Sequence, residues 1–435
     1  MNLKRLFYLI LVAAVLAGIG FGAYMYLSDR EAPNLAMTPD SGAVNGKREI
    51  TILATDKSGV RSLVVTALQD GKSVQLAELK TEPDQNGLEA VIDLGGTGFK
   101  DGKVEIIATA TDGSIYAFGK GNTGRRNFEL VLDTRPPNVA VQSGAHNLNQ
   151  GGSGLVAYKA SDDSIKTGVF VGDKFFPGYL QETGTYLAFF AFPYDMSVEE
   201  FEPVLVAIDA AGNQSEVGFR HHANARSFRD DVINISPRFL ETKMPQFRDE
   251  FPEAETDLDV FLKVNNMLRK QNRAYHYELS QRSASEPLWE GAFLRLPNSA
   301  RMAAFGDKRT YLYDGEEIDT QRHMGVDLAS TKAAEVPAAN WGRVVLAGEF
   351  GIYGQTVVID HGLGLMTLYG HLRQIDVSEG DTVEKGQVVG RTGATGLAGG
   401  DHLHYGVYVA GHPVQPVEWW DPHWIEVNVA DRLGM

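Results

Sequence analysis

The chain has 435 residues, 43% of them hydrophobic and 22% charged, so it is long enough for about three globular domains with ample core. Its formal net charge of −16 argues against the basic surface that nucleic-acid binding requires, and we expect no nucleic-acid partner. Cysteine is absent, which excludes disulfides, thiolate nucleophiles, zinc–thiolate sites and a cysteine-linked lipid anchor.

The first predicted element is an apolar helix near the N-terminus. Residues 6–27 carry no charged side chain and are numerous enough for a helix that spans a membrane. A secretory signal peptide is the alternative, but its apolar region is usually about 7–15 residues long and ends at a small-residue cleavage site. Because Lys4 and Arg5 precede the segment, we expect a cytoplasmic tail at 1–5, a signal anchor at 6–27 and the rest of the chain outside the cytoplasm. Gly18 and Gly22 form a GxxxG pair, a weaker indication of a dimer through this helix.

The next part of the chain is predicted to form two β-sandwiches. Short segments rich in Val, Ile and Thr, such as REITILATD and KVEIIATATD, are separated by clusters of Gly, Asp and Asn. A Pro136–Pro137 pair divides this part, and we expect sandwiches at 33–135 and 136–222. The phrases DTRPP and AIDAAGNQSE resemble bacterial immunoglobulin-like modules. That resemblance implies immunoglobulin-like folds and a role as spacers or adhesive units.

A helical connector is predicted at 223–287. Ser236 followed by Pro237 is typical of a helix start, with the serine as N-cap. Thr256 with Asp259 three residues later matches a capping box at the start of a second helix. The connector is expected to orient the last domain or to lie over its binding groove as a lid.

The last part, residues 288–430, returns to β-structure, and the histidines gather there. His323 and Asp327 are four residues apart, a spacing that places both on one face of a helix or of a strand. If GDHLHYGVYV is a strand, His402 and His404 share one face, while Leu403 turns to the other. Two histidines and an aspartate would supply the three protein ligands of a catalytic zinc site, which keeps a fourth position open.

Another histidine belongs to the same group. His371 lies in TLYGHL, between a predicted strand and the next turn. The motif HExxH is absent, so the glutamate base that accompanies it is missing too. Histidines are well matched to the proton transfers that remain.

The motifs HMGVD, GIYGQTVVIDHG, YGHL and DHLH, in this order, resemble the lysostaphin-type (LytM-like) zinc metallopeptidases, which cleave peptide bonds in peptidoglycan. The resemblance covers about 110 residues, from Phe305 to Pro416. It implies one Zn²⁺ per chain bound by His323, Asp327 and His404, and catalytic roles for His371 and His402. Relatives often carry an aromatic residue and a glutamate after HLH, whereas this chain has Tyr405 and Gly406, which leaves fine specificity open.

Other histidines are expected to have no chemical role. His146, His221 and His222 lack spaced partners and are expected in loops, His361 is expected at a turn, and His412 and His423 at the surface. The glycine-rich stretch GATGLAGGD is expected to form turns, with contouring of a substrate groove as the alternative.

The fold expected from the whole sequence is mainly β: an N-terminal transmembrane helix, two immunoglobulin-like sandwiches, a short helical connector and a C-terminal antiparallel β-sheet peptidase domain. The expected function is that of a zinc metalloendopeptidase for stem or cross-link peptides, held in the inner membrane by residues 6–27, with its catalytic domain in the periplasm. One alternative is a non-catalytic activator or scaffold for other wall hydrolases, against which all five site positions are retained. Another is an adhesive surface protein, which would leave the histidine group unexplained.

Overall fold

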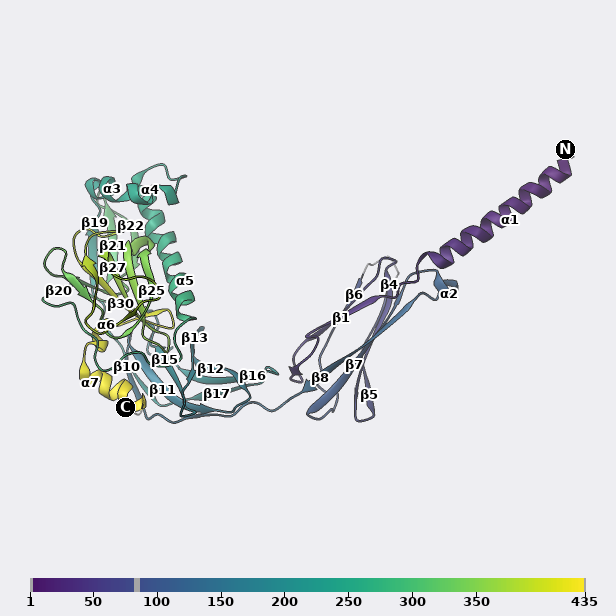
Figure 1. The fold of residues 1–435 in the computed structure, drawn as a ribbon, viewed down its shortest axis with the longest axis horizontal. Coiled ribbons are helices and arrows are strands. Elements are labelled where there is room, and N and C mark those ends of the chain that lie inside the picture. Colours follow the sequence, from purple (N-terminus) through teal and green to yellow (C-terminus); the bar gives the residue numbers. More distant parts are fainter. Residues whose placement is uncertain (1–2, 82–86, 434–435) are drawn as a thin grey trace. The chain divides into compact units, whose positions relative to one another are not determined.

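A computed structural model describes residues 3–81 and 87–433. The chain forms two compact units, which are described separately (Figure 1). The first runs to Pro137 and includes the short segment Ile208–Gln214, and the second comprises Asn138–Ala207 and the residues from Ser215 onward. The predicted mainly β fold, with an apolar N-terminal helix and a C-terminal sheet domain, is confirmed. The immunoglobulin-like character of the sandwiches stays a prediction.

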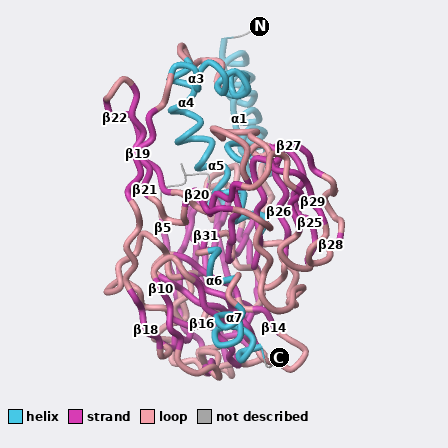
Figure 2. Tube along the Cα trace, turned by 90° about the vertical axis from the view of Figure 1, so that its left-hand side faces the viewer, coloured by secondary structure: helices cyan, strands magenta, loops and turns pink. Residues whose placement is uncertain are grey.

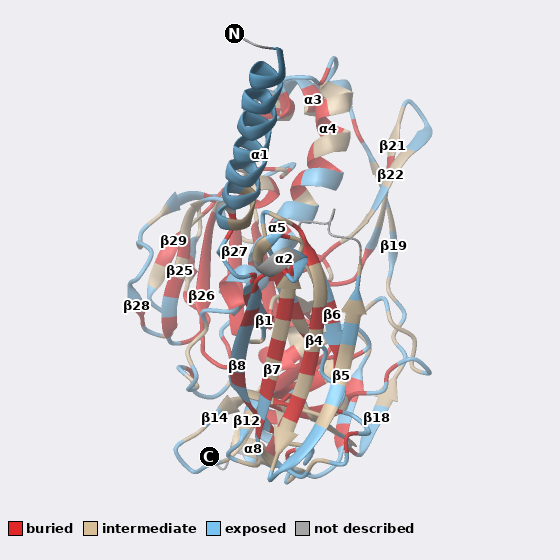
Figure 3. Ribbon diagram, turned by 90° about the vertical axis from the view of Figure 1, so that its right-hand side faces the viewer, coloured by how far each residue is buried: buried red, intermediate tan, exposed pale blue. Residues whose placement is uncertain are grey.

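Helix α1 (Leu3–Ser28) opens the first unit. Its residues Leu3–Leu27 have a mean hydropathy of 2.4 over the most apolar stretch, and that stretch is not buried by the rest of the chain. Figure 3 shows most of the helix as exposed. A helix of this length and composition can cross a membrane, and a signal sequence has the same properties.

Two sheets follow α1 and enclose one core. Their strands alternate buried and exposed positions, as the red and blue bands of β7 and β8 show in Figure 3, because successive side chains point to opposite faces. One sheet has the order β1-β3-β6 and the other the order β2-β8-β7-β4-β5. The elements are β1 Asn34–Thr38, β2 Ala43–Val44, β3 Ile50–Thr55, β4 Val60–Gln69, β5 Lys72–Lys80, β6 Gly87–Ile92, β7 Gly102–Asp112, helix α2 Tyr116–Gly119 and β8 Thr123–Leu132.

The second unit begins with two four-stranded sheets, in the orders β14-β15-β11-β9 and β13-β12-β16-β17. A short parallel pair, β10 with β18, lies outside them. The strands are β9 Val139–Val141, β10 His146–Asn149, β11 Ser153–Ala160, β12 Ser164–Val171, β13 Lys174–Pro177, β14 Tyr179–Leu180, β15 Tyr186–Ala191, β16 Val204–Asp209, β17 Gln214–Gly218 and β18 His221–Asn224.

Helices and a small sheet form the connector. Ser236 caps α3 through its side chain and Pro237 is the first helical residue, while Thr256 and Asp259 form the capping box of α4, as predicted. The elements are β19 Asp230–Asn234, α3 Pro237–Lys243, the 3₁₀ segment η1 Met244–Glu250, α4 Asp257–Lys263, the π-helical segment η2 Val264–Leu268 and α5 Arg269–Ser280. Strand β19 pairs in parallel with β21 (Lys308–Tyr313), which in turn pairs with β22 (Glu316–Arg322).

The C-terminal sheet has the path β20-β23-β30-β27-β26-β25-β28, with β24, β29 and β31 paired at its sides. Figure 2 shows its strands with the connector helices at one end and α6 and α7 at the other. The elements are β20 Ala300–Ala303, β23 Val326–Ala329, β24 Glu335–Pro337, β25 Gly342–Glu349, η3 Gly351–Tyr353, β26 Gln355–Asp360, β27 Leu365–Ile375, β28 Thr382–Val383, β29 Val388–Thr392, β30 Leu403–Val409, β31 His412–Val414, α6 Pro416–Trp419, α7 Pro422–Ile425, η4 Glu426–Ala430 and α8 Asp431–Leu433.

Both faces of this sheet are buried, each against a different partner. Along β30, Leu403, Tyr405, Val407 and Val409 belong to the core shared with the preceding sandwich, whereas Tyr408 belongs to the core shared with the connector. A period of two therefore divides the strand between two cores.

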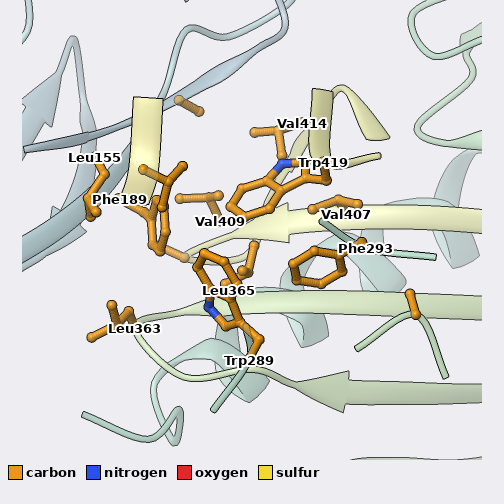
Figure 4. Close-up of a cluster of buried hydrophobic side chains, with 14 of the residues drawn as sticks. Leu155, Phe189, Trp289, Phe293, Leu363, Leu365, Val407, Val409, Val414 and Trp419 are labelled. Atoms are coloured by element: carbon orange, nitrogen blue, oxygen red, sulfur yellow. The ribbon is translucent and has the colours of Figure 1, made fainter. Parts of the chain in front are cut away.

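One continuous core joins the sandwich to the C-terminal sheet (Figure 4). The rings of Phe189, from β15, and Trp419, from α6, lie 5.5 Å apart between centroids, and Trp419 also contacts Trp289 and Phe293. Aromatic side chains bury the largest areas of any residues, so this contact makes a large contribution to the stability of the second unit.

Glu418 lies at the same junction, and we expect its titration to make the free energy of unfolding depend on pH. Burial raises its pKa to about 7, although the Ser153 backbone N–H donates to its carboxylate at 3.3 Å. Between pH 4.5 and 7 the folded state then holds a proton that the unfolded state releases, so the free energy of unfolding falls as the pH rises through this window. In the parent protein we expect the free energy of unfolding to fall by about 1–3 kcal/mol over this window because of Glu418. Glu418→Gln should remove this fall.

Urea unfolding measured at several pH values between 4.5 and 8 would check this expectation. Glu426→Gln is the matched control, because that side chain is mostly exposed in the same C-terminal region. A Glu418→Gln protein with the same pH slope as the parent would contradict the assignment.

Four of the histidines expected to be inert are placed differently from the prediction, and three of these lie on the short strands β10 and β18. His146 is not in a loop: it lies on β10, buried against the Phe190 and Phe219 rings, and burial lowers its pKa to about 3. His221 and His222 lie on the exposed strand β18, so the loop prediction is wrong for them as well. They carry no metal-ligating partners in the part of the chain that the structure describes.

The remaining histidines are structural or exposed. His361 is fully buried after β26, where its Nδ1 donates to the Trp341 carbonyl oxygen at 2.6 Å. His412 is half-buried against Phe176, not at the surface as predicted, because β31 lies in the shared core. His423 is exposed, as predicted.

Candidate metal centre

Three neighbouring strands of the C-terminal sheet bring the five predicted site residues together. Asp327 on β23 lies directly opposite His404 on β30, and Gly370 on β27 lies opposite His404 on the other side. His402 immediately precedes β30 and His371 follows Gly370, so the side chains meet at one end of these strands. His323 comes from the turn between β22 and β23.

Three donor atoms converge on one point. His323 Nε2 lies 3.0 Å from Asp327 Oδ1 and 3.1 Å from His404 Nδ1, and His404 Nδ1 lies 2.9 Å from Asp327 Oδ1. All three residues are more than 90% buried. They form a group that could hold a metal ion, and two imidazoles with one carboxylate are ligands that zinc prefers.

The protons on the imidazoles are fixed by backbone carbonyls. The Nδ1 atoms of His323, His371 and His402 donate to the carbonyl oxygens of Ala304, Thr395 and Gly400, at 2.9, 2.9 and 2.8 Å. A carbonyl only accepts, so each of these rings carries a proton on Nδ1 and has a lone pair on Nε2 when it is neutral. Such outer contacts orient metal-ligating and proton-transferring imidazoles.

His404 is oriented the opposite way. Its Nδ1 faces the other ligands, and its buried Nε2 has no hydrogen-bond partner among the described residues. Gly325 makes room for this ring, because a Cβ at that position would lie 2.7 Å from Nε2. The glycine of HMGVD is therefore required by the packing of a ligand.

His371 reaches the site through a β-bulge. Gln355 pairs with Leu372 and Val357 pairs with Tyr369, so β27 contains one more residue than β26 over this stretch. His371 itself has a φ of 63°, which non-glycine residues seldom adopt. The bulge turns His371 toward His402 and His404, at ring-centroid distances of 4.9 and 5.8 Å.

The electrostatics of the site depend on Asp327. Burial would raise its pKa, but the charge of His323 and the hydrogen bonds from the histidines hold the pKa of this carboxyl well below its usual range. Burial lowers the pKa of His371 well below its ordinary value. For His402, burial is outweighed by the negative charge of Asp327, whose Oδ1 lies 3.6 Å from its Nε2 and which raises its pKa.

Arg309 on β21 holds the outer oxygen of the aspartate. Its Nη2 donates to Asp327 Oδ2 at 2.8 Å, while Oδ1 faces the histidines. Because contacts of this kind typically change metal affinity 10–100-fold, we expect Arg309→Met to weaken zinc binding by about 10-fold or more.

Competition of the full-length protein with a chromogenic chelator would measure this affinity. Arg301→Met is the matched control, since Arg301 is exposed on β20. An unchanged affinity in Arg309→Met would exclude the orienting role of Arg309.

The centre opens into a cavity of about 420 Å³. The connector supplies one wall, and the glycine-rich loop after β29 supplies another; the lining residues from these two segments are Ile233, Asn234, Ile235, Ser236, Phe239, Phe261, Arg269, Leu397, Ala398 and Gly399. The stretch GATGLAGGD thus forms both a turn and part of the cavity wall. The sequence predicts that the connector orients the last domain or covers its groove as a lid, and it does not predict which connector residues line the cavity.

Two other features are less suited to this chemistry. A larger hollow of about 980 Å³ lies elsewhere in the second unit, lined by residues such as Gln142, Gln181 and Arg432, and it contains no histidine. Asp29, Asp56 and Asp112 form a cluster of carboxylates in the first unit, where Asn122 and Ser114 already donate to Asp112.

Comparison with known proteins agrees with the geometry. Residues 321–416 match peptidase family M23, so the C-terminal part of the chain contains an M23 peptidase domain, and the predicted lysostaphin-type resemblance is confirmed. The DD-carboxypeptidase/endopeptidase Mpg of Neisseria meningitidis is 41% identical over 95 residues, which are 22% of this chain and 22% of that protein.

Two further relatives complete the comparison. The murein hydrolase activator EnvC of Escherichia coli is 35% identical over 106 residues, or 24% of this chain and 25% of EnvC. A solved structure of a Pseudomonas aeruginosa protein assigned to peptidase M23 is 22% identical and has a TM-score of 0.39, covering 62% of this chain and 92% of that one. The chain thus spans only about a quarter or less of the length of the curated relatives it matches.

Proposed function

We propose that the protein is a zinc-dependent endopeptidase that hydrolyses peptide bonds in the stem or cross-link peptides of peptidoglycan. The observation that carries the proposal is the convergence of His323 Nε2, Asp327 Oδ1 and His404 Nδ1 beside two further histidines, at the end of a cavity. The name of a Vibrio cholerae relative, peptidoglycan DD-endopeptidase ShyA, supports the same substrate class.

The residues present fit one zinc ion per chain. Two imidazole nitrogens and one carboxylate oxygen leave a fourth position open, as catalytic zinc sites require. When bound, zinc supplies Lewis-acid polarisation of the scissile carbonyl and activation of water. Asp327 neutralises charge at the centre, and Arg309 holds that carboxylate in place.

His371 and His402 are proposed to move the proton. Each, when neutral, has a lone pair on Nε2 because its Nδ1 donates to a backbone carbonyl. One imidazole, in its neutral form, accepts a proton at Nε2 as the peptide carbonyl is attacked. The other, protonated on both nitrogens, stabilises the negative charge that develops on the carbonyl oxygen, and a proton is then delivered to the leaving amine.

The proposed cellular location of the protein is based on the apolar helix α1. We propose that it anchors the protein in the inner membrane as a single span, with residues 1–5 in the cytoplasm and both compact units in the periplasm. The first unit then serves as a spacer between the membrane and the wall. A dimer through Gly18 and Gly22 would use the same helix, and a mature N-terminus found after residue 20 would replace the anchor with a cleaved signal peptide.

The alternative is a non-catalytic activator of other wall hydrolases, the role that the name of the Escherichia coli relative states for that protein. The complete set of three ligands and two additional histidines disfavours it, because an activator has no need of oriented proton-transfer groups.

Digestion of purified sacculi tests the proposal directly. Full-length protein in detergent, loaded with zinc, should release soluble muropeptides whose masses identify the bond that is cut. If no product appears with zinc but another wall hydrolase becomes more active when the protein is added, the activator role is correct.

A further inference from the structure

A cation without an acidic partner lines the catalytic cavity. Apart from the histidines, the charged residues of its lining are Asp327, Arg309 and Arg269. Asp327 and Arg309 form an ion pair with each other. Arg269, the first residue of α5, is half-buried, and only its Nε is engaged: it donates to Asn265 Oδ1 at 2.9 Å. Within residues 3–81 and 87–433 its two Nη groups have no acceptor.

The guanidinium group is held in place by buried polar contacts. Asn265 is completely buried, and its Nδ2 donates to Asp319 Oδ2 at 2.6 Å, which fixes its amide oxygen toward Arg269. With Nε held, the two Nη groups remain as a free pair of parallel donors, the arrangement that binds a carboxylate through two hydrogen bonds.

The backbone at this point is also irregular. Asn265 belongs to the π-helical segment η2, which separates α4 from α5. Such segments are rare and occur frequently at functional sites. The buried Asn265 lies within this segment, and Arg269, which lines the cavity, follows it directly.

We propose that Arg269 binds a free carboxylate of the substrate peptide, next to the bond that is cut. This inference rests on the proposed function and adds a substrate class to it: peptides with a terminal or side-chain carboxylate close to the scissile bond. A half-buried cation with two free donor groups attracts an anion, and no carboxylate among the described residues pairs directly with Arg269.

The residue lies outside the segment that matches the peptidase family, which spans 321–416. The five residues of the metal centre therefore lie in the segment that matches the family. The residue proposed to bind the substrate carboxylate, Arg269, lies in the connector. Specificity and chemistry are thus encoded in different parts of the sequence.

Peptide binding tests the inference without relying on hydrolysis. The protein is full-length, zinc-loaded His371→Asn in detergent, so that peptides survive the titration. One pair of probes is acetyl-lysyl-D-alanyl-D-alanine and its C-terminal amide, which tests a terminal carboxylate. The other pair is acetyl-glutamyl-D-alanyl-D-alanine amide and its glutaminyl counterpart, which tests a side-chain carboxylate.

We expect the acid member of at least one pair to bind about 10–100-fold more tightly than its neutral partner, the range for a hydrogen bond to a charged group. Arg269→Gln should abolish this preference, and Arg269→Lys should restore part of it. Arg273→Gln is the matched control, because Arg273 is exposed one turn along α5 and does not line the cavity.

Equal binding within both pairs, a preference that survives Arg269→Gln, or no binding of any probe would overturn the inference. Failure of the proposed function gives a different result, since sacculi would then remain undigested whatever the carboxylate preference. Digested sacculi without a preference would leave the function intact and refute only the role of Arg269.

Discussion

Replacing His323 or Asp327 with alanine is expected to empty the metal centre and to reduce sacculus digestion to background. Each side chain contributes one of three donor atoms that lie within 3.1 Å of one another, and the remaining two ligands cannot retain the ion at ordinary zinc concentrations. Zinc per chain, measured by mass spectrometry of the metal after dialysis, should fall from about one to near zero.

The experiment must distinguish zinc that is lost because a ligand is missing from zinc that is lost because the variant does not fold. Asp327→Ala leaves Arg309 without its partner in a mostly buried position, so the isosteric Asp327→Asn should be measured beside it. His423→Ala removes an exposed histidine and should bind zinc like the parent. Full zinc occupancy in a folded His323→Ala protein would refute the ligand assignment.

Replacement of His371 or His402 should separate hydrolysis from metal binding. Neither side chain belongs to the converging ligand group, so zinc content should stay at about one per chain. Proton transfer by a positioned side chain is typically worth about 10²–10⁴-fold, and we expect losses of that size in the rate of sacculus digestion.

The backbone at His371 dictates the choice of substitution. Because its φ is 63°, alanine would combine loss of the imidazole with backbone strain, whereas asparagine tolerates this conformation. His371→Asn and His402→Gln are therefore the informative variants, with His412→Ala as a control away from the centre. Digestion at the parent rate by His371→Asn would show that the proton is moved by another group.

The HLH part of the site was predictable from the sequence alone. His402 and His404 were expected on one face with Leu403 on the other, and β30 follows that alternation, with Leu403 and Tyr405 in one core and His404 beside Asp327. A strand has only one geometric period, so two residues at even spacing determine their own relation. The caps at Ser236 and Thr256 were predictable for a similar reason, because each rests on contacts within one turn.

The position of His371 could not be predicted in this way. Regular alternation would place it with Tyr369 on the opposite face of β27, and only the extra residue of the bulge turns it toward the ligands. Which strand of a pair carries the extra residue depends on pairing with β26, a relation between distant segments that no local pattern records.

The sequence also does not predict which elements share a hydrophobic core. Apolar alternation shows that a strand has a buried face, but not which element covers it. The strands around Leu155 and Phe189 read as a self-contained sandwich, yet their core continues to Trp419. Arg269 was missed for a similar reason, since an arginine at the start of a helix has the pattern of an ordinary solvent-exposed residue.

The continuity of that core determines where proteolytic processing could release an active enzyme. A cut near residue 287 would free a piece containing all five site residues, but it would expose the face of Trp289, Phe293 and Trp419 that the sandwich covers. Aromatic side chains bury about 150–250 Å² each, so such a piece would expose a large apolar surface that promotes aggregation. A cut near the Pro136–Pro137 pair would instead leave every residue of this core in one piece, with the core closed. Under the membrane anchoring proposed for α1, we therefore expect a proteolytically released product to begin close to Asn138.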